Sequence, residues 1–252
     1  MVRQFIKRPA TSAIARQMLH ELWDRATSMQ PPLPESWVIA IGIVALVLTW
    51  SPTGYRVARH LATLLHEAGH ALIGILVGRK LSGIRLHSDT SGLTLSRGKP
   101  TGPGMVFTLL AGYPAPAVVG LGSAWLMSYG YAAGTLWGLV LICALMLVFI
   151  QNFYGLWVVL VTGAGVAVLS WTATPQILSI TAYLMAWSLL LVAPRAVVDL
   201  QRSRRRQRGR AKSDADQLAA LTRLPAGLWI LIFWLICVAC LLAGGWLLLT
   251  AS

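Results

Sequence analysis

The stretch that decides the fold of this chain reads His66-Glu67-Ala68-Gly69-His70, inside an apolar run from about residue 57 to residue 78. On an α-helix, residues i and i+4 lie one above the other, so His66 and His70 present both imidazoles to one point. H-E-x-x-H is the arrangement in which two histidines bind zinc and the glutamate, here Glu67, takes a proton from the metal-bound water. The pattern predicts a zinc site on a helix. In the alternative interpretation, the two histidines only hydrogen-bond to neighbouring groups.

The composition is that of a membrane protein. Apolar residues make up 56% of the 252 residues, and the mean hydropathy is +0.67. Runs of about 17 to 25 apolar residues follow one another, and such runs are long enough to cross a bilayer as helices. We therefore expect an all-α polytopic membrane protein with about seven transmembrane helices. The expected spans are residues 37–50, 56–78, 103–127, 132–150, 153–171, 177–194 and 226–250.

Charge indicates the domain organisation and the orientation. The net charge of +13 comes from 21 basic and 8 acidic residues, and the basic residues lie mainly outside the apolar runs. By the positive-inside rule, the basic loop Arg195–Arg223 is expected to be cytoplasmic, and counting back through the spans places Met1 there too. Residues 1–35 are then a basic cytoplasmic arm, and residues 36–252 form a single membrane-embedded domain with the loop 195–225 before its last span. The basic residues fit contact with lipid headgroups better than a nucleic-acid site.

Directly after the motif run, the sequence changes its period. Residues 84–87 and 92–95 alternate apolar with polar side chains, and Ser88-Asp89-Thr90-Ser91 between them is typical of a turn. We expect a short β-hairpin beside the motif helix. An exposed strand edge at that place could pair with an unfolded segment of a substrate.

An H-E-x-x-H motif in a membrane helix, followed by a hairpin and further spans, resembles the site-2 protease family of intramembrane zinc metallopeptidases. The resemblance is strongest to the compact bacterial branch that is often labelled peptidase-like. The matching stretches are His66–His70, Gly83–Gly92, and Ala111-Gly112-Tyr113-Pro114-Ala115-Pro116, which is similar to an Ala-Gly-Pro stretch of the family. The resemblance implies one catalytic zinc in the bilayer near the cytosolic side, cleavage of transmembrane protein substrates, and a location in the bacterial plasma membrane.

The third zinc ligand departs from the family pattern. The family takes an aspartate from a later span, within Asn-x-x-Pro…Leu-Asp-Gly. Here Asn152-Phe153-Tyr154-Gly155 keeps the asparagine, but residues 103–194 contain no Asp, Glu, His, Lys or Arg. A catalytic zinc normally takes three protein ligands and keeps one position for water. The missing carboxylate must therefore come from outside these central spans.

Two aspartates are the main candidates for that ligand. Asp199 is the first choice, because it continues the helix of the preceding span; in the alternative interpretation it is an interfacial acid paired with a nearby arginine. Asp214 is the second choice. Its alternative role is that of an acid in a first helical turn, beside a capping box formed by Ser213 and Asp216.

Three further polar residues are candidates for contacts with a substrate or with the metal. His87 and Asp89 lie in the hairpin, where they could fold back toward the metal or simply form the turn. Asn152, at the start of a span, could donate a hydrogen bond to a substrate carbonyl or could cap its helix.

These observations favour an intramembrane zinc metalloprotease that hydrolyses peptide bonds of membrane-spanning substrates, with Glu67 as the general base. A non-catalytic membrane scaffold or regulator that kept the fold but lost a ligand is the alternative. A small transporter or metal-handling protein fits less well, because its spans would be expected to carry more polar residues along a pathway. The sequence leaves the substrate and the oligomeric state open.

Overall fold

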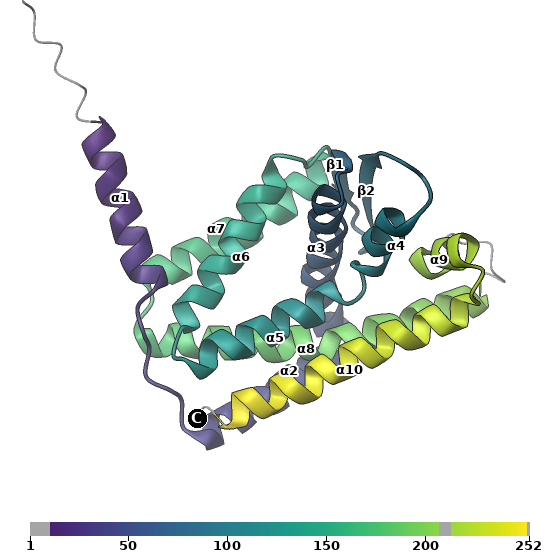
Figure 1. Ribbon diagram of the computed structural model, residues 1–252. Coiled ribbons are helices and arrows are strands. Elements are labelled where there is room, and N and C mark those ends of the chain that lie inside the picture. Colours follow the sequence, from purple (N-terminus) through teal and green to yellow (C-terminus); the bar gives the residue numbers. More distant parts are fainter. Residues whose placement is uncertain (1–10, 207–212, 251–252) are drawn as a thin grey trace, which may run out of the picture.

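The computed structural model describes residues 11–206 and 213–250, which form ten helices and one two-stranded sheet (Figure 1). The helices are α1 (Thr11–Ala26), α2 (Glu35–Trp50), α3 (Pro52–Leu76), α4 (Pro103–Leu110), α5 (Ala115–Ser128), α6 (Ala132–Leu147), α7 (Phe153–Thr172), α8 (Pro175–Arg206), α9 (Asp214–Thr222) and α10 (Ala226–Thr250). The strands are β1 (Lys80–Leu86) and β2 (Gly92–Arg97).

Three of the described helices, α7, α8 and α10, are long and apolar enough to cross a membrane. The number rises to five if the bent pairs α2–α3 and α4–α5 each count as one span. The predicted number of seven spans is therefore not confirmed. With 16 residues each, α2 and α6 rise only about 24 Å, whereas the hydrocarbon core of a bilayer is about 30 Å thick. Large apolar side chains nevertheless face outward along α7 and α10, including Trp157, Val161, Val168, Leu235, Leu242 and Trp246, as expected for a membrane protein.

The chain turns sharply between α2 and α3, whose axes differ by 96°. Ser51 is extended there, with a ψ of 150°, and its Oγ accepts a hydrogen bond of 3.1 Å from the Gly54 N–H. Pro52 occupies the first turn of α3, where a missing N–H costs nothing. A Cβ on Gly54 would lie 2.3 Å from the Leu48 carbonyl oxygen, so the turn requires glycine at this position. The turn redirects the motif helix away from α2.

A second bend, of 66°, separates α4 from α5 at residues 111–114. Pro114 and Pro116 cannot donate backbone hydrogen bonds to a continuous helix, so the expected single span 103–127 is broken. Pro194, in contrast, does not break α8. This helix continues through Pro194 and ends at Arg206, twelve residues beyond the expected end of its span. The basic segment that was expected to begin a loop therefore starts as helix.

The predicted hairpin is confirmed. β1 and β2 are antiparallel, with Leu86 opposite Gly92 and a bulge between Leu81 and Gly83. The segment before α7 lies along the other edge of β1, where the Ile84 N–H donates to the Phe149 carbonyl (2.8 Å) and the Ile84 carbonyl accepts from the Gln151 N–H (2.9 Å). One edge of β1 is thus covered, and among the described residues no backbone hydrogen bond is made to the outer edge of β2.

Two groups of buried side chains hold these elements together. The larger group joins α2, α5, α8 and α10 and includes the fully buried Ala186, Leu190 and Phe233. The smaller group joins α3, β1, α6 and α7 around Leu64, Leu65 and Ile84. In Figure 1, α3 extends from the region of α2 and α8 toward the hairpin, with α4 and α9 nearby. The motif helix therefore belongs to the smaller group and contacts α2, α4, α5 and α8, which contribute to the larger one.

Candidate metal centre

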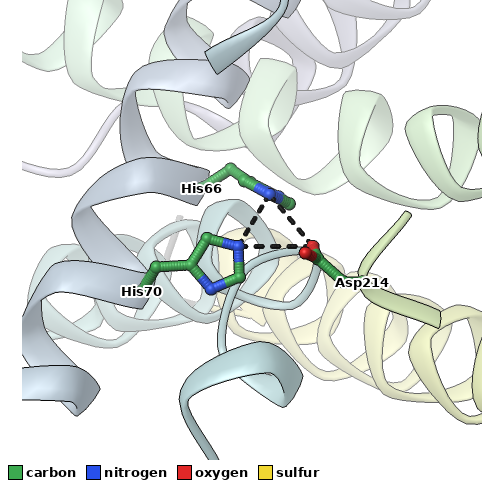
Figure 2. Close-up of side chains that lie close together, drawn as sticks. All are labelled: His66, His70 and Asp214. Atoms are coloured by element: carbon green, nitrogen blue, oxygen red, sulfur yellow. Dashed lines mark hydrogen bonds and ion pairs between the residues drawn. The ribbon is translucent and has the colours of Figure 1, made fainter. Parts of the chain in front are cut away.

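The three side chains His66, His70 and Asp214 converge at one place (Figure 2). The His66 Nε2 lies 3.0 Å from the His70 Nε2, and the Asp214 Oδ2 lies 3.3 Å from each of these nitrogens. The histidines come from neighbouring turns of α3, whereas Asp214 is the first residue of α9. Residues that are about 145 positions apart in the sequence thus form one cluster of three possible metal ligands.

The orientation of His70 is set by a backbone group. Its Nδ1 lies 2.7 Å from the Thr108 carbonyl oxygen, which can only accept a hydrogen bond. The Nδ1 therefore carries the proton, and in the neutral imidazole the lone pair of the Nε2 faces His66 and Asp214. A hydrogen bond to the second ring nitrogen is the usual way in which a protein orients a metal-binding histidine.

The cluster fits a zinc ion in size and in chemistry. A tetrahedral zinc centre has ligand bonds of roughly 2.0–2.1 Å, which separate its ligand atoms by about 3.3 Å. The separations of 3.0 and 3.3 Å in this cluster agree with that value. Two imidazole nitrogens and one carboxylate oxygen are also a donor set typical of catalytic zinc.

The carboxylate of Asp214 is suited to this position. Burial alone would raise its pKa, but the adjacent imidazoles of His70 and His66 lower the pKa well below its ordinary range. The predicted capping box is present, and it is formed by Ser213 and Asp216. Because Asp216 supplies the capping carboxylate, Asp214 is left to face the histidines.

Glu67 lies beside the cluster and is held by β2. Its side chain is buried, with 3% exposure, and its Oε2 accepts a hydrogen bond of 2.5 Å from the Thr94 hydroxyl. The same side chain packs against Gly92, where a Cβ would lie 2.4 Å from the Glu67 Oε1. The hairpin therefore determines where the carboxylate of the predicted general base lies.

Gly112, at the bend between α4 and α5, packs directly against both imidazoles. A Cβ at this position would lie 2.5 Å from the His70 Nε2 and 2.6 Å from the His66 Cε1. We expect Gly112→Ala to displace the rings and to weaken zinc binding by at least tenfold, measured by competition with a chelator. Gly122→Ala on α5 is the control, because a Cβ there meets nothing within 4 Å. Equal zinc affinity in the two variants would contradict this packing.

The structure does not bring Asp199, the first-ranked candidate, to the histidines. Its carboxylate accepts a hydrogen bond from the Tyr55 hydroxyl and lies 3.5 Å from both Arg59 and Arg202. Arg59 is seven residues before His66, so this ion-pair group lies roughly 10 Å away along the axis of α3. The order of the two candidates is therefore corrected, and Asp214 replaces Asp199 as the carboxylate of the cluster. The physical reason is that the last turns of α8 pack beside the start of α3 and not beside its centre.

The three residues that the sequence suggested for substrate contacts instead contact groups of the hairpin. The Asn152 side chain donates to the Leu86 carbonyl (2.6 Å) and accepts from the Leu86 N–H (3.1 Å), so it anchors β1 and makes no helix-capping bond. Asp89 accepts hydrogen bonds from the Ser91 N–H and hydroxyl, which lower the pKa of Asp89. His87 lies 3.3 Å from the same hydroxyl. These contacts stabilise the hairpin and its turn.

Several residues of the centre have roles that the sequence did not indicate. Gly92 and Thr94 are two residues apart, so the period of a strand places them on the same face of β2. Only the structure shows that this face contacts Glu67. Gly112 belongs to a stretch that carried the family resemblance, although its role as a packing surface for the imidazoles was not evident. The Thr108 carbonyl is a backbone group and gives no signal in the sequence.

Comparison with models of known protein families matches residues 39–244 to the family described as Peptidase M50B-like. The match covers most of the chain and includes the motif helix, the hairpin and α9. Searches of curated proteins and of solved structures found no match. The family match confirms the resemblance to site-2 proteases.

Proposed function

This chain belongs to the M50B-like peptidases, and on that premise we propose that it is an intramembrane zinc metallopeptidase that hydrolyses peptide bonds of membrane-spanning substrates. The observation that supports the proposal best is the cluster of His66, His70 and Asp214 with Glu67 next to it. These four residues supply the three ligands and the base that metal-assisted hydrolysis requires.

Each residue has a distinct part in the proposed reaction. His66, His70 and Asp214 would hold zinc, which as a Lewis acid polarises the scissile carbonyl and makes a water molecule more acidic. Glu67 accepts the proton of the attacking water and passes it to the leaving amine. Thr94 donates a hydrogen bond to the Glu67 carboxylate, which orients that group.

The surroundings of the motif helix suit an apolar substrate. A cavity of about 730 Å³ borders α3 on the face that carries Ala68 and Gly69, and apolar side chains of β1, α4, α5 and α6 line it. The outer edge of β2 lies on the same hairpin that holds Glu67. We propose that an unwound part of the substrate pairs with this edge, because cleavage requires an extended backbone.

A non-catalytic scaffold is the second candidate function. It is favoured by one sequence observation, the absence of an aspartate from the later span where the family carries it. A carboxylate from α9 now stands beside the two histidines, which supplies the missing donor type. Bound zinc and its removal distinguish the two candidates.

The test of the proposed function is cleavage by the purified full chain in lipid vesicles. Single-span reporter proteins with different transmembrane sequences would be reconstituted with it. We expect cleavage within the span, loss of cleavage on treatment with a zinc chelator, and recovery when zinc is added back. The metalloprotease proposal would be abandoned in favour of a scaffold if the chain bound no zinc, or if cleavage continued after the zinc had been removed.

A further inference from the structure

The third ligand of the centre is carried by a small element. Asp214 is the first residue of α9, which has nine residues, whereas the two histidines belong to the 25-residue α3. Ser213 directly precedes α9 as its N-cap residue. The position of the carboxylate therefore depends on the contacts that hold α9 against its neighbours.

The body of α9 is held by apolar packing. Ala215 and Leu218 are fully buried, and the helix contacts both α4 and α10. At its other end, the Trp229 Nε1 donates a hydrogen bond of 3.0 Å to the Thr222 hydroxyl. These contacts hold the apolar face of α9 from Ala215 onward and its end at Thr222, but none of them involves the side chain of Asp214.

The polar contacts of the first turn are made by the carboxylate of Asp216. Its Oδ1 accepts two hydrogen bonds from Arg204, one from the Nε (3.0 Å) and one from the Nη2 (2.6 Å). Its Oδ2 accepts from the Ser213 N–H (3.1 Å) and from the Ser213 hydroxyl (2.6 Å). Arg204 belongs to the last turn of α8, so Asp216 joins the end of α8 to the start of α9.

The ion pair between Arg204 and Asp216 restrains the first turn of α9 more strongly than a fully exposed surface pair would. The side chains of Arg204 and Asp216 are only 20% and 21% exposed, and two donors of the guanidinium meet one oxygen. A charge-assisted contact of this kind restricts orientation as well as distance. Metal coordination tolerates shifts of only about 0.2 Å in ligand distance, so a small movement of the first turn is enough to disturb it.

We infer that Arg204 and Asp216 are positioning residues for the metal: they hold Asp214 against His66 and His70 without touching the ion. This inference rests on the proposed function, because it assumes that the cluster binds zinc. It assigns part of the zinc affinity to a pair that belongs to neither the H-E-x-x-H motif nor the ligand set.

The experiment measures the affinity of the detergent-solubilised full chain for Zn²⁺ by competition with a chelator. We expect Arg204→Gln to weaken binding by about tenfold, which is the lower end of the range for residues that orient metal ligands. Arg204→Lys should recover only part of the loss, because an ammonium group cannot reproduce the two-donor contact. Arg205→Gln is the matched control, since Arg205 is an exposed neighbour with the same charge. Arg205→Gln should bind zinc like the unaltered chain.

A double-mutant cycle separates positioning from general loss of structure. In an Asp214→Asn background, Arg204→Gln should have no further effect on zinc affinity, because the residue that it positions is no longer a strong ligand. An equal loss in both backgrounds, or an Arg204→Gln variant that binds zinc as tightly as Arg205→Gln, would overturn the inference and leave the proposed function intact. Absence of zinc from the unaltered chain would overturn both.

Discussion

Glu67→Gln is expected to slow peptide cleavage by about 10²–10⁴-fold while zinc binding changes little. The amide has nearly the shape of the carboxylate and can still contact the Thr94 hydroxyl, but it cannot accept a proton from water. The cluster of His66, His70 and Asp214 is left complete, so the metal site should persist. The measurement is the initial rate of reporter cleavage in vesicles, together with the zinc content of the same preparation.

The matched control is Glu35→Gln, which removes an exposed carboxylate from the first turn of α2. It should cleave at the rate of the unaltered chain. If Glu67→Gln retained most of the activity, Glu67 could not be the general base, and the reaction would need another proton acceptor. A loss of zinc along with the activity would instead indicate that Glu67 supports the structure of the site.

Removal of the third donor should have the largest effect on zinc itself. Asp214→Ala leaves two imidazoles, and we expect it to weaken zinc binding by more than the 10–100-fold that follows from loss of an orienting residue. The reason is that a direct ligand and its negative charge are both lost from a buried site. The measurement is the dissociation constant for Zn²⁺ from chelator competition.

Asp199→Ala is the matched control, because it removes the other candidate aspartate. Its carboxylate contacts Tyr55 and two arginines, so its loss should loosen the packing of α8 on the start of α3 and should lower the thermal stability. Zinc affinity should stay within a few-fold of that of the unaltered chain. The opposite outcome, with zinc lost from Asp199→Ala and kept by Asp214→Ala, would restore Asp199 as the ligand.

Much of the fold near the centre follows from local patterns. The apolar run around His66 has the period of a helix, and the alternation on either side of Ser88–Ser91 has the period of two strands; both elements are present. The expected number of seven spans is not confirmed, and the reason is physical. Hydropathy shows that a segment prefers apolar surroundings, but it does not show whether the segment crosses the bilayer, bends at residues 51–54, or breaks at Pro114.

By itself, the sequence determined that two imidazoles lie on one face of a helix in an apolar environment, with Glu67 beside them. This follows because residues i and i+4 superpose on any α-helix, so the pair needs no tertiary contact to form. Only the tertiary structure decided which carboxylate joins them, because Asp214 and Asp199 are separated from His66 by well over a hundred residues. Their distances from the imidazoles are set by how α8 and α9 pack against α3. The continuation of the preceding helix made Asp199 the first choice, but the packing of α9 places Asp214 at the candidate metal centre.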